Sequence, residues 1–293
     1  MHSFLRSIGF SKIKKKKQID ALIQDVIENP DRKIISEDAE GNVFAELSRD
    51  YGEFIGIAVR GEYTDDETFE ADYFYPYFQG TGITTYESVD IEKHAEKESY
   101  AGICDELKVG VTLIFYLQNV MEYLNKEKNN NNYEINTATT LSALSGFGKI
   151  LLPIEKERCQ TNTDENLTKE RNHLIAAARE GDEEAIESLT LEDIDTYSMI
   201  SRRIMHEDVL TIVNSYFMPY GIESDQYSIL GEILDYHTIE NYLTHEKIYL
   251  LTVNCNDLVF DVCINSADLL GEPAVGRRFK GVIWMQGTIH YDN

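Results

Sequence analysis

Two adjacent arginines near the C-terminal end of the chain, Arg277 and Arg278, suggest chemistry by their type and spacing. A guanidinium is planar and always charged, and its N–H groups match carboxylates and phosphates, so the pair predicts a contact with an anion. The stretch that holds the pair, GRRFKGVIWMQG, also holds Trp284, the one tryptophan of the chain. A tryptophan beside cations can stack on a nucleobase. The stretch therefore indicates an anion contact, a nucleic-acid platform or the closing strand of a barrel.

The charge around this stretch disfavours nucleic acid. Residues 221–293 contain eleven Asp and Glu against four Lys and Arg, and the whole chain has a net charge of −25. Proteins that bind nucleic acid neutralise its phosphates with Lys and Arg in a positive groove. We therefore expect no nucleic acid and no anionic membrane as partners. We interpret the stretch as a closing strand with Trp284 packed inside, which leaves Arg277 and Arg278 open as a contact.

A second candidate surface lies in the aromatic stretch DYFYPYF. In a strand, Tyr73, Tyr75 and Tyr77 share one face, and Phe74 and Phe78 share the other. With the tyrosines outward, the strand would present a ladder suited to sugars, cations or a protein partner. The alternative is ordinary packing, because tyrosines are also frequent in half-buried sheets. Both interpretations stay open from the sequence.

The motifs that would indicate an enzyme fail on their spacing. The GFGK of residues 146–149 lacks the first glycine and the hydroxyl of a phosphate-binding loop, so we expect a turn there. His94 with Glu98, and His206 with its acidic neighbours, match no metal-ligand pattern. No GxSxG nucleophile motif occurs. We expect no catalytic residue, no metal and no cofactor.

The cysteines and the apolar segments indicate a cytoplasmic protein. The four cysteines form no CxxC pair. If Asn256-Asp257 is a two-residue hairpin turn, Cys263 faces Leu250 and not Cys255, so we expect buried, reduced thiols. No stretch is long and apolar enough to span a membrane, and the N-terminus does not fit a signal peptide.

The hydrophobic periodicity predicts the secondary structure. The expected elements are a helix over residues 14–30, strands over 42–82 with a hairpin turn at 64–67, a helix over 108–128, a strand pair over 141–154, helices over 169–217 and strands from 227 to 291. For residues 108–128 the alternative is a strand that runs into a helix, because the segment begins with β-branched residues.

These elements predict an α+β fold with separate parts. We expect an N-terminal α/β domain over residues 1–154 and a linker over 155–168. A central helical segment over 169–218 then precedes a C-terminal small antiparallel β-barrel-like (OB-like) domain over 219–293.

Several long blocks of the sequence resemble a known family. They are MHSFLRSIGFSKI, HAEKESYAGICDELKVGVTLIFYLQN, AAREGDEEAIESLTLEDIDTYSMISRRI, FMPYGIESDQYSILGEI, NCNDLVFDVCIN and LLGEPAVGRRFKGVIWMQG. These blocks resemble the clostridial family catalogued as domain of unknown function 3881, from the first residue to the last strand. The resemblance implies a bacterial cytosolic protein, and it carries over no activity, ligand or site residue.

The sequence therefore predicts a non-catalytic binding or protein-interaction module, whose partner is another protein or a small ligand. The alternative is a hydrolase with a non-contiguous carboxylate-based site that acts on a small polar or sugar-like substrate. That alternative requires a cleft with two convergent carboxylates or a His–acid pair.

Overall fold

The computed structural model describes residues 3–37, 43–64, 68–93, 99–129, 137–154, 209–222 and 224–291, with short pieces between 173 and 189. The helices are η1 (Ser3–Ile8), α1 (Lys16–Glu28), α2 (Val120–Asn129), α5 (Val209–Ile212) and η2 (Ser266–Asp268). The strands are β1 (Arg32–Glu37), β2 (Val43–Gly52), β3 (Ile55–Tyr63), β4 (Phe69–Phe78), β5 (Asp90–Lys93), β6 (Tyr100–Glu106), β7 (Val111–Leu117), β8 (Thr137–Leu151), β9 (Tyr216–Pro219), β10 (Gln226–Glu240), β11 (Lys247–Cys255), β12 (Leu258–Asn265), β13 (Leu269–Leu270) and β14 (Arg278–Tyr291).

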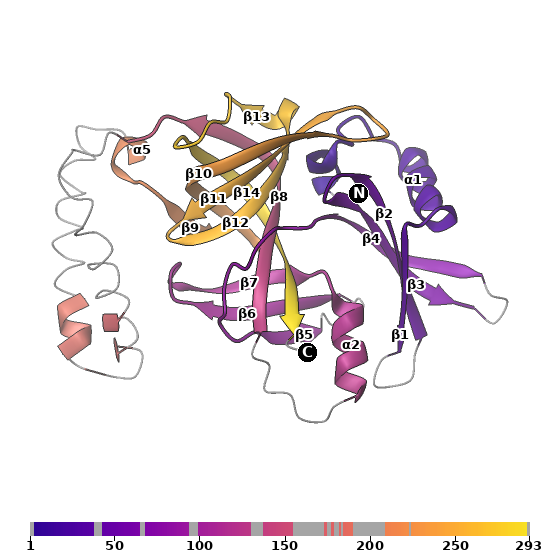
Figure 1. Ribbon diagram of the computed structural model, residues 1–293, viewed down its shortest axis with the longest axis horizontal. Coiled ribbons are helices and arrows are strands. Elements are labelled where there is room, and N and C mark those ends of the chain that lie inside the picture. The colour runs from indigo at the N-terminus through magenta and orange to yellow at the C-terminus, as the bar shows by residue number, and fades with distance from the viewer. Residues whose placement is uncertain are drawn as a thin grey trace.

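The strands form two sheets (Figure 1). The first is a four-stranded antiparallel meander in the order β1-β2-β3-β4. Helix α1 covers one face of it, because the apolar side chains of the helix repeat every three or four residues. Leu22 and Val26 of α1 belong to one buried cluster with Leu47, Ile57 and Val59 of the sheet.

The second sheet has ten strands and contains a closed ring of pairings. In the ring, β8 pairs with β12 in parallel, and β12-β11-β10-β14 continue antiparallel until β14 pairs with β8. Strands β7, β6 and β5 extend the sheet beyond β14, where Gln286 pairs with Tyr116. Strands β8 and β14 run antiparallel side by side along nearly their whole length (Figure 1).

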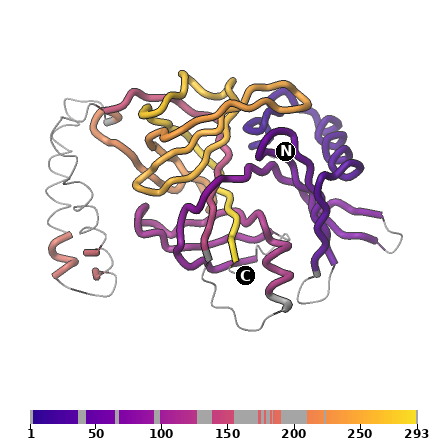
Figure 2. Tube along the Cα trace, viewed as in Figure 1, coloured from indigo at the N-terminus to yellow at the C-terminus, as the bar shows by residue number. Residues whose placement is uncertain are grey.

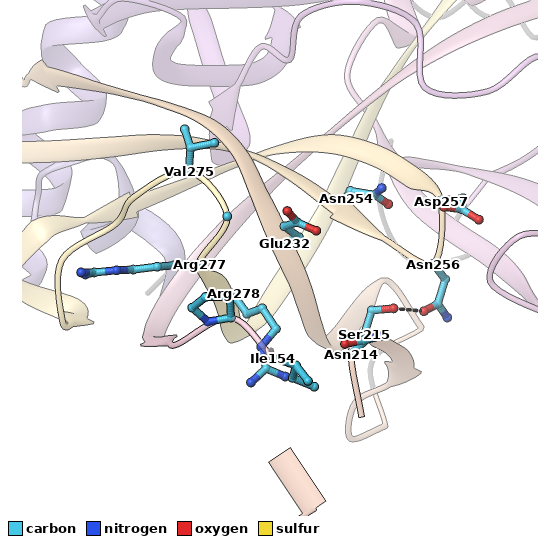
Figure 3. Close-up of a pocket in the computed structure, with 12 residues that line it drawn as sticks. Ile154, Asn214, Ser215, Glu232, Asn254, Asn256, Asp257, Val275, Arg277 and Arg278 are labelled. Atoms are coloured by element: carbon cyan, nitrogen blue, oxygen red, sulfur yellow. Dashed lines mark hydrogen bonds between the residues drawn. The ribbon is translucent and has the colours of Figure 1, made fainter. Parts of the chain in front are cut away.

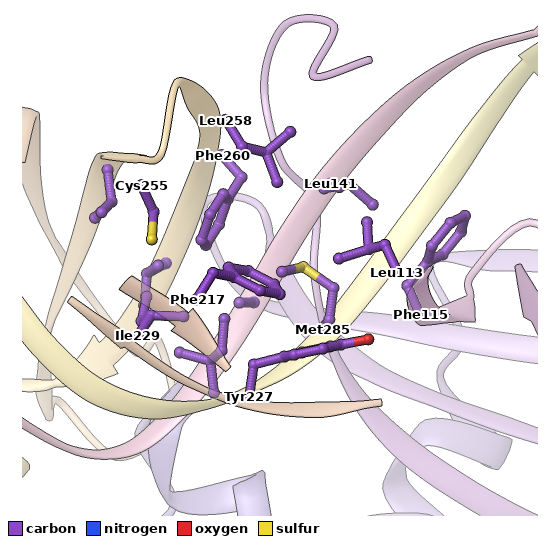
Figure 4. Packing of buried hydrophobic residues seen from close by; sticks show 14 of the residues in the cluster. Leu113, Phe115, Leu141, Phe217, Tyr227, Ile229, Cys255, Leu258, Phe260 and Met285 are labelled. Atoms are coloured by element: carbon purple, nitrogen blue, oxygen red, sulfur yellow. The ribbon is translucent and has the colours of Figure 1, made fainter. Parts of the chain in front are cut away.

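The interior of the ring is apolar. Phe260, Ile229 and Met285 are buried there together with Phe217 and Tyr227, whose ring centroids lie 4.5 Å apart (Figure 4). Close packing of such large side chains is the main source of stability in a protein interior.

The predicted α+β fold class is wrong: the described residues are mostly strands in two sheets. The C-terminal strands do not form a small sheet of their own, because β8, far away in the sequence, completes their ring. Hydrophobic periodicity reports the local element and not its distant partner. Most of the predicted helical segment 169–218 and the whole predicted linker 155–168 lie outside the described residues.

The predicted elements have mixed outcomes. Helix α1 and the hairpins of β2 to β4 and of β10 to β12 confirm the predictions. The helix over residues 108–128 is wrong, because the segment is strand β7 followed by helix α2, as the alternative proposed. The strand pair over 141–154 is also wrong, because β8 is one long strand. Strand β8 contains Gly148, and the ring of Phe279 occupies the space that a Cβ atom at this position would need.

The N-terminal segment packs against the C-terminal half of the chain (Figure 2). Helix η1 contacts β8, β12 and β4. Arg6 pairs with Asp268, and the Ser7 hydroxyl donates to the carbonyl of Ser145 at 2.8 Å. No helix among the described residues is long and apolar enough to cross a membrane.

A buried arginine joins the two sheets. Arg60 on β3 is 2% exposed, and its Nε donates to Glu46 Oε2 at 2.5 Å. Nη1 donates to the Tyr73 hydroxyl at 2.7 Å, and Nη2 donates to the Tyr75 hydroxyl and to the carbonyl of Gln118, both at 3.1 Å. Gln118 follows β7, so one guanidinium bonds to both sheets.

Three tyrosine rings surround this guanidinium. Its carbon lies 5.1 Å from the ring centre of Tyr75 and 5.8 Å from those of Tyr73 and Tyr116. Cations are attracted to aromatic faces, more strongly where water is excluded. Burial raises the pKa of Tyr75 and Tyr116 well above the ordinary value although Arg60 opposes the shift, so both hydroxyls stay neutral donors and acceptors.

Replacing Arg60 should therefore destabilise the whole fold. We expect Arg60→Met to lower the free energy of unfolding by at least about 3 kcal/mol, because the largely buried carboxylate of Glu46 loses its cationic partner. Lys126→Met, which breaks the more exposed pair with Glu122, should cost less than about 1 kcal/mol. Urea denaturation measures both. Similar losses in the two variants would contradict this role of Arg60.

The buried thiols should be unreactive in the folded protein. Burial raises the pKa of Cys104 and of Cys255 to about 12, and it raises the pKa of Cys263 as well. A raised pKa leaves the thiol protonated at pH 8, and only the thiolate attacks disulfide reagents. The fourth cysteine, Cys159, lies outside the described residues, and Cys159→Ser leaves only the three buried thiols. This variant should therefore not react with Ellman's reagent at pH 8 until denaturant is added. Rapid reaction of these thiols in native buffer would contradict the burial.

Candidate functional site

A cavity of about 680 Å³ lies at one end of the ring, where β14 begins (Figure 3). Five chain segments contribute to its wall: the residues after β8, the residues before β9, strand β10, the end of β11 with the following turn, and the loop before β14. The lining residues are Pro153, Ile154, Asn214, Ser215, Glu232, Asn254, Asn256, Asp257, Val275, Gly276, Arg277 and Arg278. This volume lies within the range of ordinary small-molecule sites.

The turn between β11 and β12 forms one side of the cavity. Asn256 and Asp257 have φ angles of 52° and 63°, the left-handed conformation that two-residue hairpin turns favour. The turn sets the register, so Leu250 pairs with Cys263 as the sequence predicts. Asn256 Oδ1 accepts a 2.6 Å hydrogen bond from Ser215, the dashed line in Figure 3. This bond attaches the turn to the segment that precedes β9.

The loop before β14 forms the opposite side. Gly276 has a φ of 80°, a conformation that side chains rarely allow. Its N–H donates to the carbonyl of Ile233 at 2.9 Å, and the N–H of Ile233 donates to the carbonyl of Arg277 at 2.8 Å. The loop is thus held on β10, and the two arginine side chains point apart (Figure 3).

The structure places both predicted arginines at the cavity, in different environments. Arg277 is half-buried, and its Nη1 donates to the carbonyl of Glu272 at 2.8 Å. Arg278 is only 7% exposed. Its Nε donates to the carbonyl of Leu152 at 3.0 Å and its Nη1 to that of Val213 at 2.8 Å.

Arg278 has no carboxylate partner among the described residues. Its register partner Glu232 carries an exposed side chain that is not within ion-pair distance. Burial lowers the pKa of Arg278, and no acid among the described residues offsets the shift. A guanidinium has five N–H groups, so hydrogen-bonding capacity remains beyond the two carbonyls. An anion in the cavity would compensate a charge that the described residues leave without a carboxylate.

Arg278 also has a structural role. Leu152 lies where the chain leaves β8, and Val213 lies just before β9. One side chain therefore connects the end of β8 to the segment that precedes β9. Any variant of Arg278 must be judged on both stability and binding.

The polar residues around the arginines complete the site. Three asparagines, a serine and two acids line the same cavity, at Asn214, Asn254, Asn256, Ser215, Glu232 and Asp257. Amides and hydroxyls both donate and accept hydrogen bonds. The sequence did not single out these residues, because they come from separate turns and strand ends, and turn chemistry at Asn256-Asp257 is the one local signal among them. No group of three or more His, Cys, Asp and Glu among the described residues is arranged to hold a metal ion.

The three predicted tyrosines lie away from this cavity. Tyr75 and Tyr77 are 3% and 4% exposed, and Tyr73 is half-buried beside Arg60. The exposed ladder is therefore wrong, and packing within the sheet describes these residues. The reason is that the sheet is covered on both faces, by α1 and by the ten-stranded sheet, so the tyrosine face is also an inner face.

Trp284 is packed inside, as the sequence predicts. It is 5% exposed, and its Nε1 donates to Asp225 Oδ2 at 2.6 Å. Its ring stacks on Phe4, with centroids 5.5 Å apart, and lies 5.3 Å from the ring of Tyr116. At 5% exposure the ring offers too little surface for a nucleobase to stack on it.

Comparison with known proteins identifies the family. The family model described as "Domain of unknown function, E. rectale Gene description (DUF3881)" matches residues 5–287. The chain belongs to this family. The match covers both sheets, so the DUF3881 resemblance seen in the sequence blocks is confirmed. No curated protein and no solved structure matches the chain.

Proposed function

We propose that this DUF3881 protein is a non-catalytic cytoplasmic binding module, and that its ligand is a small polar molecule with a carboxylate or phosphate group. The observation that carries the proposal is Arg278, a buried cation at the wall of a cavity with no carboxylate partner among the described residues. Charge-assisted hydrogen bonds from a guanidinium to an anion are among the strongest in proteins, particularly away from water.

The rest of the wall supports a ligand with further polar groups. The asparagine amides and the Ser215 hydroxyl can bond to hydroxyls or amines, and the carboxylates of Glu232 and Asp257 can accept from them. An inorganic ion is small and accepts hydrogen bonds, so it would leave the carboxylates of the wall without a donor. The proposed ligand is therefore an anion with several hydrogen-bonding groups, such as a hydroxy acid, an amino acid or a sugar phosphate.

The alternative function, a hydrolase on a small polar or sugar-like substrate, rests on Glu232 and Asp257, the two carboxylates of this cavity. Hydrolysis would require one of them to act as an acid or base on the bound ligand. Turnover of a ligand that is lost in Glu232→Gln, while binding persists, would favour this alternative.

An anion that binds the folded state should raise the melting temperature in proportion to the logarithm of its concentration. We expect citrate and inorganic phosphate at millimolar concentration to do so, against sodium chloride of equal ionic strength. Arg277→Met should reduce the shift and leave the melting temperature of the ligand-free protein unchanged, because among the described residues the side chain of Arg277 bonds to one backbone carbonyl and to no other group.

Lys280→Met is the matched control, since Lys280 lies on β14 three residues after Arg277 but does not line the cavity. It should keep the full shift. Equal shifts in wild type and Arg277→Met, or no shift with either anion, would contradict the proposal.

A further inference from the structure

A second groove, of about 530 Å³, lies between the N-terminal segment and the strands β8, β14 and β9. One wall carries the apolar side chains of Phe4, Leu5, Phe10 and Ile13, and the other wall is formed by Phe147, Val282 and Tyr220. This lining is mostly apolar, and the size suits a small molecule. The cavity beside Arg278 shares no lining residue with it.

The apolar surface continues beyond the groove. Phe147 pairs with Val282, Val282 with Ser228, and Ser228 with Met218, so these four residues form one row across β8, β14, β10 and β9. Paired residues of neighbouring strands point to the same face. Phe147 is 55% exposed and Met218 is 50% exposed. Tyr220, two residues after Met218, is 49% exposed. Apart from Ser228, this row is apolar, and an exposed apolar surface of this kind marks a binding site.

The rim of the groove is basic. Arg6 and Lys14 line it, and Lys14 has no acidic partner among the described residues, whereas Arg6 is paired with Asp268. Residues 1–17 contain six Lys and Arg and no acid, in a chain with a net charge of −25. The segment that forms one wall of the groove therefore carries a net positive charge in an acidic protein.

We propose that this groove binds a small anionic amphiphile, an apolar chain or ring system with one carboxylate or phosphate head. The apolar body would lie against Phe147 and Tyr220, and the head would lie at Lys14. A large anionic partner, such as a membrane or an acidic protein segment, is disfavoured because the surrounding acidic surface repels it at long range. A small ligand with one charge experiences mainly the local cations.

The fluorescence of Trp284 should report binding in this groove, because Phe4 lines the groove and also stacks on the indole of Trp284. Decanoate below its micelle concentration should change the tryptophan fluorescence in a saturable way. Acetate, which has the head without the chain, should not. 1-Decanol, which has the chain without the charge, should bind about tenfold more weakly, the equivalent of one lost ion contact.

Two variants test separately the contact with the hydrocarbon chain of the ligand and the contact with its charged head. Phe147→Ser should weaken decanoate binding about tenfold or more through lost apolar burial, and it should fold, because Phe147 is 55% exposed. Lys14→Met should weaken decanoate binding but not decanol binding. Lys12→Met is the matched control, because Lys12 is exposed and does not line the groove.

The proposal is overturned by equal effects of Lys14→Met and Lys12→Met, by a fluorescence change that does not saturate, or by preferential binding to anionic phosphatidylglycerol vesicles or to an acidic peptide. Arg277→Met should leave decanoate binding unchanged. Loss of decanoate binding in Arg277→Met would also overturn the proposal, because the two sites would then not be separate.

Discussion

The buried guanidinium of Arg60 is the interaction on which the two sheets depend. It is almost completely withdrawn from water, and Glu46, two tyrosine hydroxyls and the carbonyl of Gln118 replace that water. Glu46 belongs to the four-stranded sheet, whereas Gln118 follows β7 of the ten-stranded sheet. Such a group specifies one arrangement of the sheets, because any shift would leave a buried charge with unsatisfied donors.

The second constraint is the long pairing of β8 with β14. It closes the ring, and it brings Leu152 at the end of β8 next to Arg278 at the start of β14. The cavity arises at this junction because a hairpin turn, a glycine-containing loop and two strand ends meet there without filling the space. Both arginines owe their position to the same junction, so the fold and the proposed binding site have a common origin.

The sequence predicts local features of this protein well and distant ones poorly. The turn at Asn256-Asp257 follows from two residues, and it correctly sets the pairing of Leu250 with Cys263. The burial of Trp284 is predicted because the acidic residues around it disfavour a nucleic-acid surface and leave packing inside as the interpretation. The ring closed by β8 could not be predicted, because nothing within residues 137–151 indicates a partner more than a hundred residues away.

The candidate sites show the same limit. Alternation separates Tyr73, Tyr75 and Tyr77 from their neighbours, but it does not say whether a sheet is covered on one face or on both. The sequence predicts Arg277 and Arg278 as site residues because they are two adjacent cations. Glu232 and Asn254 line the same cavity, but no local pattern in the sequence distinguishes them. The DUF3881 family model matches residues 5–287, a range that includes strands of both sheets.

Native mass spectrometry of the protein purified from its own host tests the central claim most directly, because it reports the bound molecule and its stoichiometry together. We expect one small polar anion in the cavity beside Arg278, which is released on denaturation and is lost when Arg277 is replaced by methionine. An amphiphile bound in the separate second groove would not be affected by this replacement. A chain that carries no small polar anion, or a polar anion that remains after the replacement, would contradict the assignment of the cavity beside Arg278 as an anion-binding site.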